Sequence, residues 1–213
     1  MYATVTQPDF EKLTKYINRF DGFFTSRHAR LCGYSVQNQS YHVKQGNWER
    51  QGWGIFRYKY YPRLANHRPD LIVATLWSCG RTGVPQGVIS HDTALSVHKL
   101  STWSGHGIHM TVPPNFRRRT QCIYKVRLHK AELEDDDIED MESFRVTTPL
   151  RTIVDLLLST HIESIHLVDA MNDALRQRLI TLNQMKEAKL TPHEKQLLIG
   201  LLRRVNYSKA DEI

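Results

Sequence analysis

The sequence is poor in cysteine and contains no long apolar run. Its three cysteines, Cys32, Cys79 and Cys122, are odd in number, far apart and in no CxxC pair. This spacing argues against a disulfide framework or a zinc ribbon and favours a reducing cytoplasm. No apolar stretch approaches the roughly 18–20 residues that cross a bilayer, and the start, MYATVTQPDFEKL, shows no secretory signal. We therefore predict a cytoplasmic protein with no membrane partner.

The chain also lacks the short motifs of common enzymes: it has no P-loop, GxGxxG, GxSxG or HExxH sequence. Ser90, His91 and Asp92 are the residue types of a catalytic triad, but side chains at consecutive positions diverge, so we expect Ser90 to cap a helix instead. Two histidine pairs lack a suitably spaced carboxylate or cysteine to complete a metal site, His91/His98 and His106/His109. We predict that the protein is not an enzyme and uses no cofactor or metal.

Positive charge, in contrast, is concentrated in the first third of the chain. The formal net charge is +7, and residues 1–65 hold 10 Lys/Arg against 4 Asp/Glu. The rest of the chain holds the other 19 of the 29 basic and 18 of the 22 acidic residues, which nearly cancel. This asymmetry is typical of a small module that binds a polyanion, joined to a near-neutral domain.

The basic third of the chain predicts three helices. Apolar residues at three- and four-residue steps indicate the first helix, over residues 8–20. The second, SRHARLC, has Thr25 or Ser26 as its N-cap, and the third, VQNQSYHVKQ, has Ser35. The second and third helices are separated by a short turn containing Gly33, which is the spacing of a helix-turn-helix.

The residues after the third helix predict a β-hairpin. The segment WERQGWG followed by IFRY indicates two short strands joined by a glycine-rich turn. A hairpin directly after a helix-turn-helix is a wing. The polar segment from Asn66 to Pro69 indicates a linker, so we predict a winged helix-turn-helix domain over residues 1–63 and a second domain over 69–213.

The second domain predicts a larger, mixed α+β fold that ends in helices. Strands are indicated by IHMTVPP, CIYKVRLH and residues 144–147. Helices are indicated by DLIVATLW, by residues 90–100, by LRTIVDLLLS, by residues 162–179 and by the last segment from residue 191. Thr148 is expected to cap a helix that has Pro149 at its first position, and Thr191 and Glu194 have the spacing of a capping box.

The third predicted helix carries polar side chains suited to reading DNA. Gln37, Asn38 and Tyr41 lie at positions that share a face, and amides pair well with the adenine edge in the major groove. Lys44, one turn later, is better placed for phosphate, and Ser35 begins the helix. Further phosphate contacts are expected from basic residues on the second helix and around the wing, namely Arg27, Arg30, Arg50, Arg57 and Lys59.

Other charged groups leave alternatives open. Arg117, Arg118 and Arg119 either contact phosphate or form a solvated loop. The acidic stretch Glu132–Glu142 is an exposed face, a contact for the basic module, or a contact for a basic partner protein. Arg151 and Asp155 are four residues apart on the helix predicted for LRTIVDLLLS, and we expect them to form a structural ion pair.

These segments resemble the AbiEi-type antitoxins of bacterial type IV toxin–antitoxin and abortive-infection systems. The likeness rests on GYSVQNQSYHVKQGNWERQGWGIFRY in the first domain. In the second it rests on ISHDTALSVHKLS, IHMTVPP, VRLHKAEL and VTTPLRTIVDLL, in the family's order. The sequence departs from the family's pattern at Gln39 and His42, where leucine-like core residues are expected, and Trp48 replaces the usual leucine after the helix.

The resemblance implies a two-part function. The N-terminal domain would bind inverted repeats in its own promoter and repress the operon. The C-terminal domain would counteract a nucleotidyltransferase-like toxin, and this would not need a stable toxin–antitoxin complex. Two alternatives stay open. One is a nuclease or other DNA-modifying enzyme, which requires clustered carboxylates with a nearby lysine. The other is a transcription factor with a ligand-sensing domain.

Overall fold

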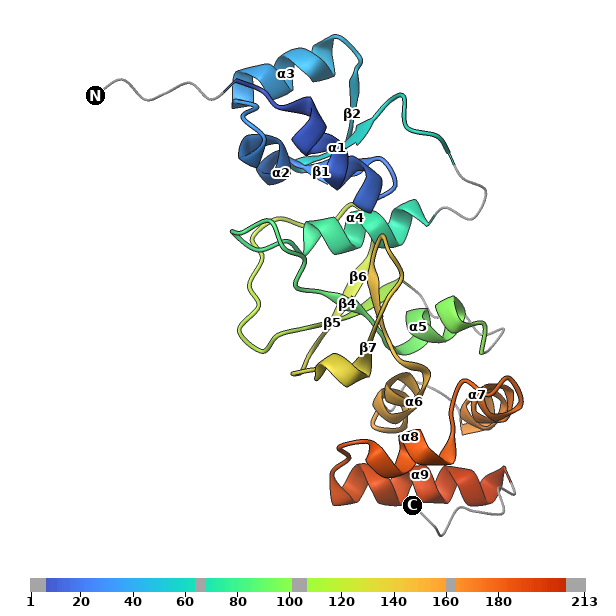
Figure 1. Ribbon diagram of the computed structural model, residues 1–213. Coiled ribbons are helices and arrows are strands. Elements are labelled where there is room, and N and C mark those ends of the chain that lie inside the picture. The colour runs from blue at the N-terminus through green and yellow to red at the C-terminus, as the bar shows by residue number, and fades with distance from the viewer. Residues whose placement is uncertain (1–6, 64–67, 101–106, 160–163, 206–213) are drawn as a thin grey trace. The chain divides into compact units, whose positions relative to one another are not determined.

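The computed structural model describes residues 7–63, 68–100, 107–159 and 164–205, and it has a mixed α+β fold (Figure 1). This agrees with the predicted α+β class. The chain forms two compact units. The first comprises Met1–Gly87, Val112–Val126 and Asp140–Arg145, and the second comprises Val88–Thr111, Arg127–Glu139 and Val146–Ile213. Each unit therefore contains segments that are far apart in the sequence.

The first unit begins with the three helices that the sequence predicts. Their bounds are Phe10–Arg19 (α1), Ser26–Leu31 (α2) and Val36–Lys44 (α3). Thr25 caps α2 by accepting a hydrogen bond from the amide of His28, and Ser35 caps α3 by accepting one from the amide of Asn38. Such caps satisfy amides that have no partner inside the helix and contribute about 1 kcal/mol each.

A sheet with the strand order β1-β3-β2 packs with these helices. The strands are Phe23–Thr25 (β1), Trp48–Gly52 (β2) and Ile55–Tyr58 (β3), all antiparallel to their neighbours. The predicted hairpin is confirmed: β2 and β3 are joined by Trp53 and Gly54, and Gly54 has the positive φ of 68° that this tight turn requires. Strand β1 was not predicted, because three residues are too few to show an alternating pattern.

The core of this region is largely aromatic. Phe24 lies at its centre with 0% exposure, 4.8 Å from the ring of Trp48 and 5.8 Å from that of Phe56. Leu13 and Ile17 of α1 complete the cluster from one side. Burial of each such side chain contributes about 1.5–3 kcal/mol.

The helix α4, Pro69–Trp77, is apolar on every side and buried from Leu71 onward. It contacts β1 and β3, so it belongs to the first compact unit. The sequence-based division assigned residue 69 onward to the second domain, and the observed grouping differs because a helix without a polar face must be covered all round. Within the described residues, no helix has the length and apolar character needed to span a membrane.

The second unit contains a sheet with the order β6-β5-β4-β8-β7. Strands β4 and β5 are antiparallel, whereas β4 and β8 are parallel, with Ile89 opposite Val146. The bounds are Val88–Ile89 (β4), Ile108–Val112 (β5), Val126–Lys130 (β6), Ile138–Asp140 (β7) and Arg145–Thr147 (β8). The predicted strand from Cys122 begins only at Val126, and β7 lies within the acidic stretch Glu132–Glu142, for which no strand was predicted.

Helices complete the second unit, with α6 to α9 packed together at the end of the chain (Figure 1). Their bounds are His91–His98 (α5), Pro149–Leu157 (α6), Ser164–Arg176 (α7), Leu182–Glu187 (α8) and Pro192–Arg204 (α9). The predicted Thr148 cap with Pro149 and the Thr191–Glu194 capping box are confirmed. The helix predicted to reach Leu179 ends at Arg176, because Arg178 adopts a left-handed φ of 58°.

Candidate functional site

The buried side of α3 carries a polar side chain. Gln39 is only 3% exposed. Its side-chain amide donates to the carbonyls of Tyr34 at 2.9 Å and Ser26 at 3.3 Å, and its side-chain oxygen accepts from the Ser26 hydroxyl at 2.7 Å. The ring of His42 stacks on Trp48 with centroids 4.8 Å apart. Gln39 and Trp48 are therefore buried, and His42 lies partly buried against Trp48.

The opposite side of α3 is exposed. Gln37, Tyr41 and Lys44 are spaced at four and three residues and all lie on the surface, with Tyr41 58% exposed. Ser35 is exposed at the N-cap, but its hydroxyl accepts from the Asn38 amide at 3.2 Å. The side chain of Asn38 is partly buried, so it lies at the edge of this face.

Basic side chains flank α3. Arg27 and Arg30 lie three residues apart on α2 and are exposed. Arg50, on β2, is exposed with its guanidinium carbon 5.2 Å from the centre of the Phe56 ring. Lys59 follows β3, its ammonium 5.9 Å from the centre of the Tyr60 ring. These four cations are accessible to a ligand in solution.

Arg57 requires a correction. It was predicted to contact phosphate, but it is only 4% exposed. Its guanidinium donates to the carbonyl of Tyr61 at 2.7 Å and to that of Tyr58 at 3.4 Å, and it lies 3.9 Å from a carboxylate oxygen of Glu49. The central strand β3 is covered on both faces, so Arg57 points inward and holds the segment after the strand.

Sequence reasoning also missed two exposed apolar side chains near this surface. Val36, at the start of α3, is 60% exposed, and Trp53, at the hairpin turn, is 75% exposed. The signal for Trp53 was its place between Gly52 and Gly54, because a bulky residue in such a tight turn has nothing to pack against. An exposed tryptophan next to arginines is a common feature of ligand-binding surfaces.

His28 of α2 has a structural role. It is buried, and its ring stacks on Tyr16 with centroids 4.2 Å apart. The ring Nδ1 accepts from the Thr25 amide at 3.3 Å, so Nε2 carries the proton and donates to the carbonyl of Gly83 at 2.8 Å. Burial lowers the pKa of His28, although the bond to Gly83 acts in the opposite direction. The neutral ring joins α2 to the loop after α4.

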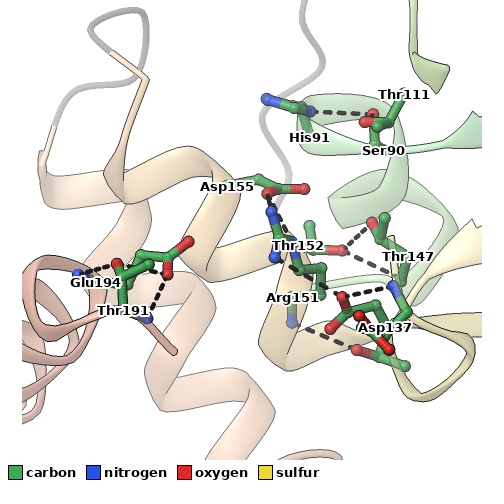
Figure 2. A network of polar contacts seen from close by, with 12 residues as sticks. Ser90, His91, Thr111, Asp137, Thr147, Arg151, Thr152, Asp155, Thr191 and Glu194 are labelled. Carbon is green, nitrogen blue, oxygen red and sulfur yellow. Dashed lines mark hydrogen bonds and ion pairs between the residues drawn. The ribbon is translucent and has the colours of Figure 1, made fainter. Parts of the chain in front are cut away.

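In the second unit, the triad-like residues form different contacts from those expected. The Nδ1 of His91 lies 3.0 Å from the Ser90 hydroxyl, which also accepts from the Thr111 hydroxyl at 2.8 Å (Figure 2). Ser90 is the N-cap residue of α5, as predicted, but its side chain makes no cap hydrogen bond. Neighbouring side chains touch here because His91 adopts a φ of 53°. Asp92 lies against His109 instead, with 3.3 Å between Oδ2 and Nε2.

The predicted pair of Arg151 and Asp155 is confirmed, with 2.8 Å between nitrogen and oxygen (Figure 2). Arg151 also lies 3.7 Å from a carboxylate oxygen of Asp137. Burial raises the pKa of Asp155 to about 6 even though Arg151 acts to lower it. One oxygen of Asp155 is buried with no hydrogen-bond partner among the described residues. This arrangement ties α6 to the segment before β7.

The acidic stretch is divided among several environments. Asp137 pairs with Arg151, Glu134 lies 3.3 Å from Lys189, and Asp140 lies 2.7 Å from Arg19 of the basic region. A cavity of about 490 Å³ opens beside the stretch in the second unit. It is lined by the acidic side chains of Glu132, Glu134, Asp136, Asp137, Glu187 and Glu194, together with Arg151 and Lys189.

No group of three or more histidine, cysteine, aspartate or glutamate side chains in the described part of the chain is arranged to hold a metal ion. His98 lies 2.7 Å from the carbonyl of Thr147, and His129 lies 3.2 Å from His109. His106, the partner proposed for His109, lies outside the described residues. Neither the models of known protein families nor the curated protein sequences include a match to this chain.

Proposed function

We propose that residues 7–63 form a winged helix-turn-helix that binds double-stranded DNA, with α3 in the major groove. The order of elements supports this proposal: α2 and α3 follow one another across a short turn, and a β-hairpin comes directly after α3. The exposed cations Arg27, Arg30, Arg50 and Lys59 would contact phosphates on both sides of the groove.

The observation that carries the proposal is the division of α3 into two faces. Gln39 is fixed inward by three hydrogen bonds, so the helix cannot rotate without breaking them. Gln37, Tyr41 and Lys44 then share the outward face, and α3 contains no acidic residue. A cation-bearing helix with a free glutamine amide suits both the negative groove and the base edges within it.

The biological role that fits this module is that of an antitoxin repressor. It would bind inverted repeats in the promoter of its own operon and repress transcription. The second unit would counteract a nucleotidyltransferase-like toxin encoded beside it, without requiring a stable complex. This part of the proposal is supported by the resemblance of ISHDTALSVHKLS and VTTPLRTIVDLL to the antitoxin family, and by the near-neutral charge of the chain beyond residue 65.

The DNA-binding proposal is tested by fluorescence anisotropy of the full chain with a labelled duplex from upstream of its gene, over a range of salt concentrations. The contacts of Arg27, Arg30, Lys44, Arg50 and Lys59 alone predict a slope of log affinity against log salt of about −4.5 per bound chain, and any further phosphate contact makes the slope steeper. A scrambled duplex should bind more weakly with a similar slope. A slope near zero would contradict the proposal.

A pair of variants separates base reading from general binding. Gln37→Ala with Tyr41→Ala should bring the affinity for the promoter duplex toward that for the scrambled duplex, with little change in salt dependence. Gln45→Ala is the matched control, because Gln45 is an exposed amide at the end of the same helix. If the control loses as much discrimination as the double variant, α3 does not read bases through its outward face.

The antitoxin role is tested by growth of cells that express the adjacent nucleotidyltransferase-like gene. Co-expression of this chain should restore growth. Variants of Arg27 and Arg50 should retain the rescue when expressed from an unrelated promoter, because they affect DNA contact alone. Failure of the wild-type chain to restore growth would remove the antitoxin role while leaving the DNA-binding proposal intact.

A further inference from the structure

A pocket of about 470 Å³ in the first unit has four arginines and no carboxylate in its lining. It opens beside the hairpin turn, at the start of α2. A volume of this size is typical of sites for small ligands and exceeds what a lone phosphate needs. The lining residues are Thr25, Ser26, Arg27, Arg30, Trp53, Gly54, Ile55, Leu76, Cys79, Gly80, Arg81 and Arg118.

The four arginines come from three parts of the chain. Arg27 and Arg30 belong to α2, Arg81 follows α4, and Arg118 lies in the segment between β5 and β6. The Arg118 guanidinium is oriented by two bonds, from Nη1 to the carbonyl of Cys79 at 2.9 Å and from Nε to the Thr120 hydroxyl at 3.2 Å. The Nε and Nη1 atoms of Arg118 are therefore held by the protein, while the side chain stays exposed to solvent.

These positive charges have no carboxylate partner among the residues that the structure describes. Across residues 7–63, 68–100, 107–159 and 164–205, none of the four arginines forms an ion pair with a carboxylate. Cys79, at the wall of the pocket, adds no negative charge, because burial raises the pKa of its thiol to about 12. Like charges gathered at one opening raise the local positive potential, which favours an anion.

The shape of the guanidinium group and the neighbouring aromatic ring narrow the choice of anion. Arginine donates in a planar fork that matches two oxygens of a phosphate. Trp53 is 75% exposed at the edge of the pocket; such a ring stacks on the base of a free nucleotide, whereas a duplex keeps its bases inside the helix and presents only its phosphates to the arginines. Ile55 and Leu76 provide apolar walls. Phosphate oxygens together with a flat ring are the chemistry of a nucleotide.

The pocket adjoins the helix that we propose reads DNA. Ser26 lines the pocket, and its hydroxyl donates to the side-chain oxygen of Gln39 on α3 at 2.7 Å. A phosphate bound by Arg27 and Arg30 would thus lie near the N-terminal half of α3. A recognition helix lies in the major groove, so the phosphates of the strands that border the groove lie beside it.

We propose that this pocket binds a nucleotide phosphate of the DNA strand beside the groove, with Arg81 and Arg118 extending the DNA contact beyond the winged helix-turn-helix. The inference rests on the proposed DNA-binding function. It assigns DNA contact to two residues outside 1–63, and it selects Arg118 from the run Arg117–Arg119. Arg117 and Arg119 do not line the pocket.

The test uses two double variants that remove the same charge. The Arg81→Ser/Arg118→Ser variant removes two of the four positive charges that line the pocket. The Arg117→Ser/Arg119→Ser variant is the control, because it removes two positive charges that lie beside Arg118 in the sequence but outside the pocket. For the first double variant, we expect the slope of log affinity against log salt to become less steep by about 1.8. The change should be the same for the promoter and the scrambled duplex. The control should change the slope by clearly less. Equal slopes for the two double variants would overturn the proposal.

Two further measurements separate the possible failures. Because Arg118 bonds to the carbonyl of Cys79, thermal unfolding of each variant is compared, and Arg81→Ser alone should still flatten the slope by about 0.9. If the wild-type chain does not bind duplex DNA, the proposed function fails. If it binds and the Arg81→Ser/Arg118→Ser variant binds identically, only this inference fails.

A free nucleotide is the other source of the same chemistry. Deoxyadenosine monophosphate is titrated while tryptophan fluorescence is followed, with Trp53→Phe as the control for the signal. The DNA strand would be ruled out as the ligand by two results together. The quenching would require Trp53, Arg81 and Arg118, and the Arg81→Ser/Arg118→Ser variant would bind duplex DNA with the wild-type salt slope. The pocket would then be assigned to a free nucleotide. No quenching together with a flattened duplex slope would support the DNA strand as the ligand.

Discussion

The hydroxyl of Ser26 donates a hydrogen bond of 2.7 Å to the side-chain oxygen of Gln39, joining the first turn of α2 to the buried side of α3. The same glutamine donates to the carbonyl of Tyr34 in the turn between the two helices. A single amide thus holds α2, the turn and α3 in one arrangement. A leucine at this position would fill the space without fixing the rotation of α3.

Gln39→Leu should therefore lower the free energy of unfolding by about 1–3 kcal/mol, because the buried carbonyl of Tyr34 loses its donor. Gln39→Glu should cost more at neutral pH, since a carboxylate would face that carbonyl without a proton to donate. Guanidinium unfolding of the two variants measures both effects. A Gln39→Leu protein as stable as the wild type would mean that packing alone holds the helices.

Arg57 and Arg50 should respond in opposite ways to the same substitution. Arg57→Gln is expected to lower the unfolding free energy by about 2 kcal/mol, through loss of its charged bond to the carbonyl of Tyr61, and to leave the salt dependence of DNA binding unchanged. Arg50→Gln should change stability by less than about 0.5 kcal/mol and flatten the salt slope by about 0.9. Urea unfolding and anisotropy titrations check the pair. If Arg57→Gln instead left stability unchanged and made the salt slope less steep, Arg57 would be a DNA-contacting residue.

His28 should make the first unit sensitive to acid. Burial lowers the pKa of His28 from an ordinary value near 6.5, so its contribution to stability is fully present above about pH 6.5 and is lost as the pH falls below that value through the lowered pKa. His28→Gln should therefore cost more stability at pH 8 than at pH 5, when each is compared with the wild type. Unfolding curves at the two pH values measure this, with the exposed His193→Gln as control. A cost that grows toward pH 5 would contradict the assigned neutral ring.

Asp155 predicts the opposite dependence in the second unit. Burial raises its pKa from about 3.8 to about 6, so its protonated form is stabilising, and that contribution is lost as the pH rises from about 4 through 6. The stability of Asp155→Asn relative to the wild type should rise over this range by up to about 3 kcal/mol. Denaturant unfolding at pH 4 and 7 checks it, with the exposed Asp136→Asn as control. A falling difference would show that Arg151 outweighs burial.

The sequence was sufficient to predict the helices whose N-termini carry a capping hydroxyl residue. Thr25, Ser35, Thr148 and Thr191 each cap a helix as expected, because a hydroxyl at that position satisfies an amide whatever the rest of the chain does. The α8 helix was missed although Thr181 and Gln184 form the same capping box. Its apolar face is a single turn long, so its sequence shows no period.

Side-chain direction was harder to predict than the elements. Nothing in the segment IFRY distinguishes Arg57 from a solvent-facing arginine, because its burial follows from the covering of both faces of β3 in the folded chain. The pocket arginines were hidden for a similar reason. Arg81 and Arg118 are far apart in sequence, and only the folded chain brings them beside Arg27 and Arg30.

The position of α4 bears on how the chain can be divided for expression. Its buried residues, from Leu71 to Trp77, contact β1 and β3, and the segment that follows supplies the carbonyl of Gly83 to His28. A fragment ending at residue 63 would expose the strands that α4 covers and would leave His28 Nε2 without its acceptor. The first compact unit also includes Val112–Val126 and Asp140–Arg145, so a cut after Gly87 would still remove the Thr120 carbonyl that Trp77 binds, and point substitutions map the two activities better than deletions.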